Sequence, residues 1–175
     1  MPHYTIEGKQ RIPINDKDFL EGMKKGYFVK RRHKAFVALL YYTACRVSEV
    51  LRTKREQFKV TEKEIIWDVG KRLKHGLETP PLNISLSLPY ANEIAHAVRY
   101  TQKGERVFPY TRVTGWIIVR RVFKYPHFFR LSRITNFFLE GWTIAQVRSW
   151  TGLSLRALEY YVGLVDVKKM GESLR

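Results

Sequence analysis

The sequence predicts a mainly helical α+β fold with a small antiparallel three-stranded sheet. Most apolar residues recur at the spacing of an α-helix, and one stretch near the middle of the chain has the β-branched and aromatic residues of short strands. The chain has 175 residues, of which 45% are hydrophobic, and this size and composition suit one domain. We expect that domain to cover residues 1–165, followed by a polar tail at residues 166–175.

Three helices are expected before the strands. The first covers residues 16–24, with Asn15 or Asp16 as its N-cap. The second covers residues 34–43 and is apolar. Residues 46–51 also have helical spacing, so a third, short helix follows the second almost directly.

The strands are expected in the middle of the chain. Residues 58–60 and 65–69 are rich in β-forming residues and are separated by a charged turn, which indicates a hairpin. Residues 79–86 are predicted to add a third strand. Pro80 and Pro81 restrict that strand to a sheet edge or to its own first residues, because proline lacks the N–H that a sheet requires.

The helical period returns after Pro89. Ile94, Ala95, Val98 and Tyr100 fall on or near one face of the next predicted helix. Four more helices are expected after it, at residues 113–123, 126–140, 143–150 and 154–161.

Residues at the ends of these later helices support their boundaries. Pro126 suits a first helical turn and Gly141 a stop. Thr143 and Ser154 are good N-caps, and Gly152 allows the turn between the last two helices.

Composition excludes several classes of protein. An aromatic content of 14% argues against disorder. The single cysteine, Cys45, cannot build a disulfide framework or a Cys-rich zinc site, and we expect neither a metal nor a cofactor. Residues 35–45, the longest apolar stretch, are shorter than the ~20 residues of a membrane span, and the N-terminus lacks the apolar core of a signal peptide. We therefore expect an intracellular protein without a membrane partner.

The charge points to a polyanionic partner. Lys and Arg number 32 against 16 Asp and Glu, which gives a net charge of +16. Nucleic acid is the commonest partner of such a protein, and an anionic membrane surface is the next. The basic residues cluster between apolar segments, as on the exposed rims of folded elements. We expect the nucleic-acid contacts to come from these clusters: Arg31, Arg32, Lys34, Arg52, Lys54, Arg55, Lys71, Arg72, Arg120 and Arg121.

Two pairs of residues have the spacing of a phosphate site. Arg46 and Glu49 are three residues apart on a predicted helix, so the carboxylate can orient the guanidinium, which binds a phosphate through two hydrogen bonds. His127 and Arg130 share one face at a helix start, with Phe128 and Phe129 turned toward the core. Taken alone, each pair is more often an ordinary surface or core feature.

A lysine loop and a tyrosine pair complete the set of candidates. Lys71 and Lys74 lie between the second and third strands, where a lysine can reach DNA or protonate a leaving oxygen. Tyr160 and Tyr161 lie in the last predicted helix, and a tyrosine hydroxyl can attack phosphorus. The ordinary interpretations are a solvated turn and two packed aromatic rings.

Together and in this order, these residues resemble the catalytic domain of the tyrosine recombinases, which include phage-type and archaeal integrases. Residues 43–51, TACRVSEVL, are similar to the first box of that family, T-G-x-R-x-S-E after an apolar helix. Residues 74–76 and the strand that follows resemble its lysine hairpin, and His127-x-x-Arg130 matches its second box. Residues 143–152 resemble the helix and turn before the nucleophile. The resemblance runs from about residue 16 to about residue 164 and implies the tyrosine recombinase catalytic-domain fold.

The resemblance implies breakage and rejoining of DNA strands through a 3′-phosphotyrosine, without metal or ATP. Arg46 and Arg130 would hold the scissile phosphate, and Tyr161 would attack it. His127 would accept the tyrosine proton, and Lys74 would protonate the departing 5′ oxygen.

The resemblance also implies partners. The substrate would be double-stranded DNA that carries a recombination site. The protein would act as a homotetramer on synapsed DNA and be a monomer or dimer when free, with residues 166–175 docking on a neighbouring protomer. An archaeal viral or plasmid integrase is the expected type, either as a fragment of a larger integrase or as a minimal one.

The sequence departs from the family pattern near the nucleophile. Leu153 occupies the position after the turn glycine where the family has His or Trp, and leucine cannot donate a hydrogen bond to phosphate. Tyr161 requires one deletion relative to the family spacing and Tyr160 requires two, which favours Tyr161. Lys74 is favoured over Lys71 by its distance to Pro81.

Two other functions compete with recombination. Residues 143–154 also suit a helix-turn-helix motif, so the protein could bind DNA without cutting it, either as a simple binder or as an inactive recombinase. A type IB topoisomerase would use the same chemistry as a monomer and need no second duplex.

Overall fold

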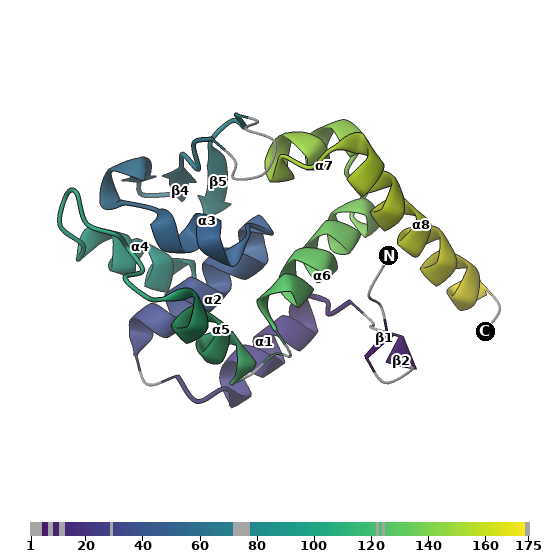
Figure 1. Ribbon diagram of the computed structural model, residues 1–175, viewed down its shortest axis with the longest axis horizontal. Coiled ribbons are helices and arrows are strands. Elements are labelled where there is room, and N and C mark those ends of the chain that lie inside the picture. The colour runs from purple at the N-terminus through teal and green to yellow at the C-terminus, as the bar shows by residue number, and fades with distance from the viewer. Residues whose placement is uncertain are drawn as a thin grey trace.

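The computed structural model describes residues 13–28, 30–71, 78–121, 123 and 125–173, together with the backbone of two short strands nearer the N-terminus; it describes no side chain at residue 164 or beyond residue 165. It confirms the predicted class, a mainly helical α+β fold (Figure 1). The helices are α1 (Asp16–Lys25), α2 (Arg31–Thr43), α3 (Val47–Arg52), α4 (Ala91–Arg99), α5 (Arg112–Arg120), α6 (Pro126–Leu139), α7 (Ile144–Thr151) and α8 (Leu155–Ser173).

The predicted antiparallel sheet forms from β3 (Phe58–Val60), β4 (Glu64–Trp67) and β5 (Leu82–Ser85), in that order. A 3-10 turn at Arg55–Gln57 precedes it. Trp67 lies opposite both Phe58 and Leu82, and Ile65 lies opposite Ile84. These residues are buried, because alternate side chains of a strand face the same side of its sheet. The β5 strand begins after the two prolines, as proline chemistry requires.

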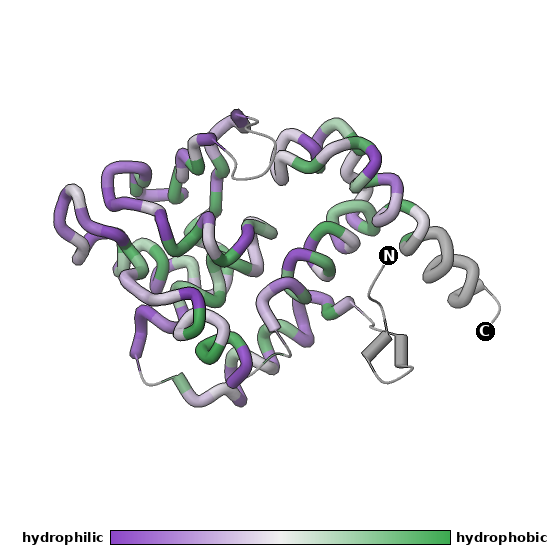
Figure 2. Tube along the Cα trace, viewed as in Figure 1, coloured by the Kyte–Doolittle hydropathy of each residue, from purple (hydrophilic) through white to green (hydrophobic). Residues whose placement is uncertain are grey.

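The first of two hydrophobic cores surrounds α2. Every residue of this helix from Ala35 to Tyr41 is at most 1% exposed. Helices α1, α3, α4, α5 and α6 and the sheet all contribute side chains to this core. Figure 2 shows the apolar residues concentrated along the inner helices, while hydrophilic stretches follow the outer loops. Burial of this kind stabilises a fold by roughly 1.5–3 kcal/mol for each large apolar side chain.

Helix α6 belongs to both cores. Phe129 packs in the first core, beside Phe123 and Tyr41, with ring centroids 4.6 and 5.9 Å away respectively. Phe128, on another face of α6, packs in a second core with residues of α7 and α8. Both phenylalanines are buried, as their predicted orientation toward the core requires. Because α6 is held from two sides, side chains at its N-terminal end have a fixed position.

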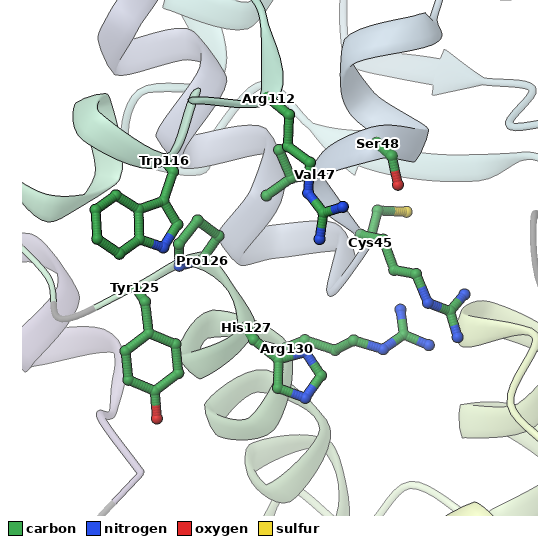
Figure 3. Close-up of a pocket in the computed structure, with 10 residues that line it drawn as sticks. Cys45, Val47, Ser48, Arg112, Trp116, Tyr125, Pro126, His127 and Arg130 are labelled. Atoms are coloured by element: carbon green, nitrogen blue, oxygen red, sulfur yellow. The ribbon is translucent and has the colours of Figure 1, made fainter. Parts of the chain in front are cut away.

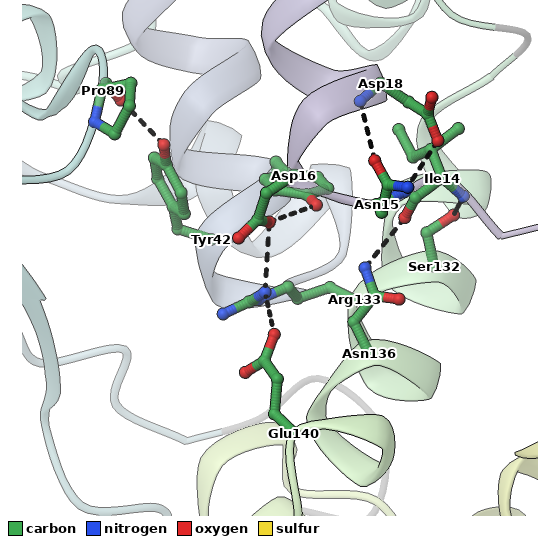
Figure 4. A network of polar contacts seen from close by, with 11 residues as sticks. Ile14, Asn15, Asp16, Asp18, Tyr42, Pro89, Ser132, Arg133, Asn136 and Glu140 are labelled. Atoms are coloured by element: carbon green, nitrogen blue, oxygen red, sulfur yellow. Dashed lines mark hydrogen bonds and ion pairs between the residues drawn. The ribbon is translucent and has the colours of Figure 1, made fainter.

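Polar contacts fasten the start of the described chain to α6 (Figure 4). The main-chain N–H of Ile14 donates to Ser132 Oγ at 3.2 Å, and Asn136 Nδ2 donates to the Ile14 carbonyl at 2.8 Å. One nitrogen of Arg133 lies 2.9 Å from Glu140 and 3.4 Å from Asp16. The Asp16 carboxylate also accepts a hydrogen bond from the Tyr41 hydroxyl at 2.7 Å. These contacts connect α1, α2 and α6.

The structure differs from the sequence prediction at Tyr100. This residue follows α4 and is 74% exposed, although we predicted it near the apolar face of the helix. Tyr100 lies two residues after Val98, which places it on the opposite side of a helix. Its ring stacks on His96 instead, with centroids 4.3 Å apart.

Element boundaries differ at both ends of the chain. Helix α2 begins at Arg31, before the predicted residue 34. The prediction missed its first turn because that turn is charged and lacks the apolar period of a helix. Two antiparallel strands of two residues each, β1 (Thr5–Ile6) and β2 (Lys9–Gln10), were not predicted. Helix α8 continues through Ser173 and leads away from the other helices in Figure 1, rather than ending near Tyr161. In the part of the chain that is described, no helix has the length and apolar content needed to cross a membrane.

Candidate active site

Arg46 is fixed at the junction between α2 and α3. Helix α2 ends at Ala44 in a left-handed conformation with φ 52°, and Arg46 is the N-cap of α3. The fully buried Glu49 carboxylate accepts a hydrogen bond from the Arg46 main-chain N–H at 2.7 Å and another from Arg46 Nη1 at 3.2 Å. The predicted pair therefore forms. Because Arg46 remains 26% exposed, its other N–H groups are open to a ligand.

Arg130 reaches the same junction from α6. Its side chain is buried and donates to the carbonyl of Ala44 and, at 3.4 Å, to the carbonyl of Thr151 at the end of α7. Burial lowers the pKa of Arg130, and the positive charge of Arg46 lowers it further. The two guanidinium groups repel each other in a partly desolvated environment, and an anion bound between them would relieve this repulsion.

These arginines line a cavity of about 260 Å³ between α5, α6 and the α2–α3 junction (Figure 3). His127 is exposed and lies in the first turn of α6, directly after Pro126. The N-terminal end of this helix adds partial positive charge to the site. The residues that line the cavity are Cys45, Arg46, Val47, Ser48, Arg112, Trp116, Tyr125, Pro126, His127 and Arg130.

Tyr161 lies within the electric field of both arginines. Its ring is 7% exposed and packs in the second core, and it is not among the residues that line the cavity. Burial raises the pKa of the Tyr161 hydroxyl, while the charges of Arg130 and Arg46 act in the opposite direction. Burial raises the pKa of the Tyr160 hydroxyl to about 12, and the neighbouring Tyr161 acts in the same direction. The two adjacent tyrosines therefore have different electrostatic surroundings.

The lysine loop is placed only at its two ends. Lys71 is exposed and pairs with Glu78 in an antiparallel bridge, and its carbonyl accepts a hydrogen bond from Arg52 Nη2. Lys74 and Arg72, which we predicted as a catalytic and a DNA-binding residue, lie outside the described residues.

The other predicted DNA contacts lie at the start of α2, at the end of α3, at the 3-10 turn that follows it and at the end of α5. Exposed members are Arg31, Arg52, Lys54, Arg120 and Arg121, whereas Arg32, Lys34 and Arg55 are half-buried. The end of α5 lies near enough to the start of α2 for the charge of Arg121 to lower the pKa of His33. Arg55 donates to the carbonyl of Phe58 at 3.1 Å and so has a structural contact as well.

The sequence analysis missed the contribution of α5. Arg112 and Trp116 line the cavity, although we regarded residues 113–123 only as an apolar helix. A signal was available, because Arg112, Trp116 and Arg120 recur every four residues and therefore share one face. Gly115 lets α5 approach α2, since a Cβ at this position would lie 3.0 Å from the ring of Phe36.

Leu153 is part of the second core and only 8% exposed. Its main-chain N–H bonds to Thr151 Oγ1 at 3.3 Å, and its side chain has no hydrogen-bond donor. The position after the turn glycine therefore contributes packing between α7 and α8.

Comparison with known proteins identifies the fold. No protein-family model and no curated protein matches the chain by sequence. Among solved structures, the XerH site-specific recombinase bound to its difH substrate, in a pre-cleavage complex, has a TM-score of 0.69 and 16% identity over 86% of this chain and 49% of that one. The XerA recombinase has a TM-score of 0.64 and 16% identity over 94% of this chain and 65% of that one. The Tn1549 transposon integrase in complex with circular intermediate DNA has a TM-score of 0.59 and 15% identity over 89% of this chain and 62% of that one.

The chain thus spans about half to two thirds of the length of these solved proteins. At such low identity the likeness concerns the fold. The neighbours are tyrosine recombinases, and they share the helical arrangement and the small antiparallel sheet described above. We conclude that this chain has the fold of the tyrosine recombinase catalytic domain.

Proposed function

We propose that this chain is the catalytic part of a site-specific DNA recombinase or integrase, which cleaves and rejoins DNA strands through a 3′-phosphotyrosine intermediate. The observation that most supports this proposal is the meeting of Arg46, His127 and Arg130 at one cavity, with both arginines acting on the Tyr161 hydroxyl. These residues come from three separate parts of the sequence, and an ordinary surface ion pair would not require them to meet.

The scissile phosphate is the proposed ligand of the two arginines. A guanidinium has five N–H donors, and the bonds to Glu49, Ala44 and Thr151 use only some of them. Arg46 and Arg130 would bind the two non-bridging oxygens and stabilise the charge that grows on them in the transition state. Glu49 acts as a positioning residue, because it holds Arg46 in one orientation.

In the proposed reaction, the Tyr161 oxygen forms a bond to phosphorus and the bond from phosphorus to the 5′ oxygen breaks. His127 accepts the phenol proton, and Lys74 donates a proton to the departing oxygen, which leaves a free 5′ hydroxyl. Attack by the 5′ hydroxyl of a second strand reverses these steps. Because the phosphotyrosine retains the energy of the phosphodiester, the exchange of strands requires neither ATP nor a metal.

Double-stranded DNA is the proposed substrate. The net charge of +16 and the exposed basic residues of α2, α3 and α5 would bind its phosphates, so affinity should fall steeply as salt rises. A homotetramer on two synapsed duplexes is the proposed active form, with a monomer or dimer in free solution and residues 166–175 docking on a neighbour.

Covalent trapping tests the proposal. A duplex that the protein binds is first selected from a random-sequence pool, and labelled copies with single nicks at successive positions are then incubated with the protein in EDTA and quenched with SDS. We expect a protein–DNA adduct that is lost in Tyr161→Phe and retained in Tyr160→Phe. Loss only in Tyr160→Phe would assign the nucleophile to the other tyrosine.

A second candidate function is DNA binding without cleavage. The observation in its favour is Leu153, which places an apolar side chain in the core at the position after the turn glycine. It predicts tight binding to the selected duplex with no adduct at any nick. That result would replace the proposed enzyme with a binding protein of the same fold.

A further inference from the structure

We infer that the cavity at Arg46 and Arg130 holds one whole nucleotide of a DNA strand, with its phosphate on the arginines and its unstacked base against Trp116 and Tyr125. This inference rests on the proposed function and names the substrate more closely, as DNA that is unpaired or easily unpaired beside the reacting phosphate.

The cavity has two chemically different sides (Figure 3). Figure 3 shows Arg112 and Arg130 on one side, with His127 beneath Arg130, and Arg46 also lines the cavity. The rings of Trp116 and Tyr125 lie on the other side. A nucleotide has the same division, since its phosphate is anionic and its base is flat and weakly polar.

The size of the cavity also exceeds what a phosphate requires. Its volume of about 260 Å³ is close to the lower end of the ~300–1000 Å³ typical of sites that enclose whole small molecules. A phosphate group that is bound by Arg46 and Arg130 would fill only the cationic side. The remaining space borders the aromatic rings.

Trp116 is presented as a stacking surface. Its side chain is 42% exposed although it is large and apolar, and the Arg120 guanidinium lies 4.5 Å from the centre of its ring. This cation–π contact holds the indole in one orientation. Bases stack on exposed aromatic side chains without regard to sequence, because every base has a π-face.

Arg112 strengthens the assignment. It occupies the first position of α5, one helical turn before Trp116, so its guanidinium and the indole project from the same face. Figure 3 shows its guanidinium directed toward Arg130. It is therefore placed to contact the phosphate next to the one that Arg46 and Arg130 hold.

The first test uses small probes and the fluorescence of Trp116. Trp67 is fully buried and Trp142 and Trp150 are half-buried, so Trp116 is the one exposed tryptophan among the described residues. The wild-type protein is titrated with thymidine 5′-phosphate, with 2-deoxyribose 5-phosphate and with inorganic phosphate. We expect thymidine 5′-phosphate to quench the emission and to bind roughly tenfold more tightly than the sugar phosphate, which has no base. Equal affinities with no quenching would overturn the inference.

Variants of α5 distinguish the effect of losing the Trp116 ring from a general effect on the folding of the helix. Trp116→Ala should lose the preference for the base, whereas Trp116→Phe should keep the preference and lose the quenching. Ile117→Ala is the matched control, because Ile117 is 48% exposed on the same helix and does not line the cavity. It should keep both properties. A base preference that survives in Trp116→Ala would contradict the assignment.

The second test uses DNA itself. A 20-base-pair duplex is compared with the same duplex that carries one unpaired thymidine. We expect roughly tenfold tighter binding of the duplex with the unpaired base, and the difference should vanish in Trp116→Ala. Equal binding of both duplexes would mean that the rings contact only the outside of paired DNA.

Covalent trapping distinguishes failure of this inference from failure of the proposed function. If adducts form at the same rate in Trp116→Ala and no probe shows a base preference, the cavity holds phosphate alone and the recombinase proposal stands. If the base preference is present and no adduct forms on any nicked duplex, the nucleotide site stands without the strand-transfer chemistry.

Discussion

The guanidinium of Arg130 donates a hydrogen bond to the main-chain carbonyl of Ala44, a residue that lies 86 positions earlier in the chain. Ala44 ends α2 in a left-handed conformation, and Arg46 follows two residues later. The same backbone segment, residues 44–46, therefore positions both arginines. A change at Arg130 should disturb Arg46 as well, so their contributions to phosphate binding should not be independent.

Arg130→Lys should remove most covalent adduct formation. A lysine cannot contact both the Ala44 and Thr151 carbonyls and a phosphate as the guanidinium does, because all its donors lie on one nitrogen atom. We expect a fall of about 100-fold or more in the trapping rate, measured on nicked duplex. Arg148→Lys, an exposed change on α7, is the control and should stay near the wild-type rate. Normal trapping by Arg130→Lys would remove this residue from the site.

Glu49→Gln should slow the reaction while leaving DNA affinity nearly unchanged. Glutamine can still accept the bond from the Arg46 main-chain N–H, but it lacks the charge that fixes the guanidinium. We expect the trapping rate to fall by about 10-fold, as measured by single-turnover kinetics. Glu49→Ala should in addition lower the free energy of unfolding by about 1–3 kcal/mol, because it leaves the part-buried Arg46 N–H without its acceptor. Equal rates in Glu49→Gln and wild type would exclude a positioning role.

Stability should fall as the pH drops below about 6.5, the ordinary pKa of histidine. Burial lowers the pKa of His33, and the nearby charges of Arg121 and Lys30 lower it further. In the folded protein His33 therefore takes up its proton at a lower pH than in the unfolded chain. Its contribution is complete above pH 6.5 and is lost as the pH falls toward and through the lowered pKa.

Denaturant unfolding at pH 7.5 and pH 5.5 measures this effect. The loss of unfolding free energy between the two pH values should be smaller in His33→Gln than in wild type, because glutamine does not titrate in this range. An unchanged loss would assign the pH dependence to other groups.

Arg133→Ala should destabilise the protein by about 1–3 kcal/mol, since Arg133 connects Asp16 and Glu140 and its guanidinium carbon lies 4.5 Å from the centre of the Phe137 ring. Thermal unfolding provides the measurement. Lys25→Ala is the control, because Lys25 and Glu21 form an exposed pair 3.9 Å apart that should contribute less than about 0.5 kcal/mol. Similar losses in both variants would mean that the network in Figure 4 adds nothing beyond a surface ion pair.

The fold and part of the site could be predicted because their signals are local. The pairing of Arg46 with Glu49 follows from a three-residue spacing on a helix, and the burial of Phe128 and Phe129 follows from the period of α6. Tyr100 was misplaced because it was read as part of the face of Val98, whereas a step of two residues turns a side chain to the far side of a helix.

The role of α5 could not be predicted in the same way. The four-residue spacing of Arg112 and Trp116 shows that they share a face, but the rotation of α5 about its axis decides where that face points. This rotation depends on the contact of Gly115 with Phe36, which joins residues 79 positions apart in the sequence (115 − 36). No local sequence pattern predicts a contact between residues so far apart. The catalytic roles that we assign stay predictions for all five residues, which are Arg46, Lys74, His127, Arg130 and Tyr161.

The close approach at Gly115 also makes the width of the cavity adjustable from within the protein. Phe36 is fully buried and does not line the cavity, yet its ring limits how near α5 comes to α2 at Gly115. A larger residue at position 115, or a smaller one at position 36, would shift one wall of the site without touching the residues that line it. A substitution in the hydrophobic core can therefore change the shape of the cavity while the residues that line it stay the same.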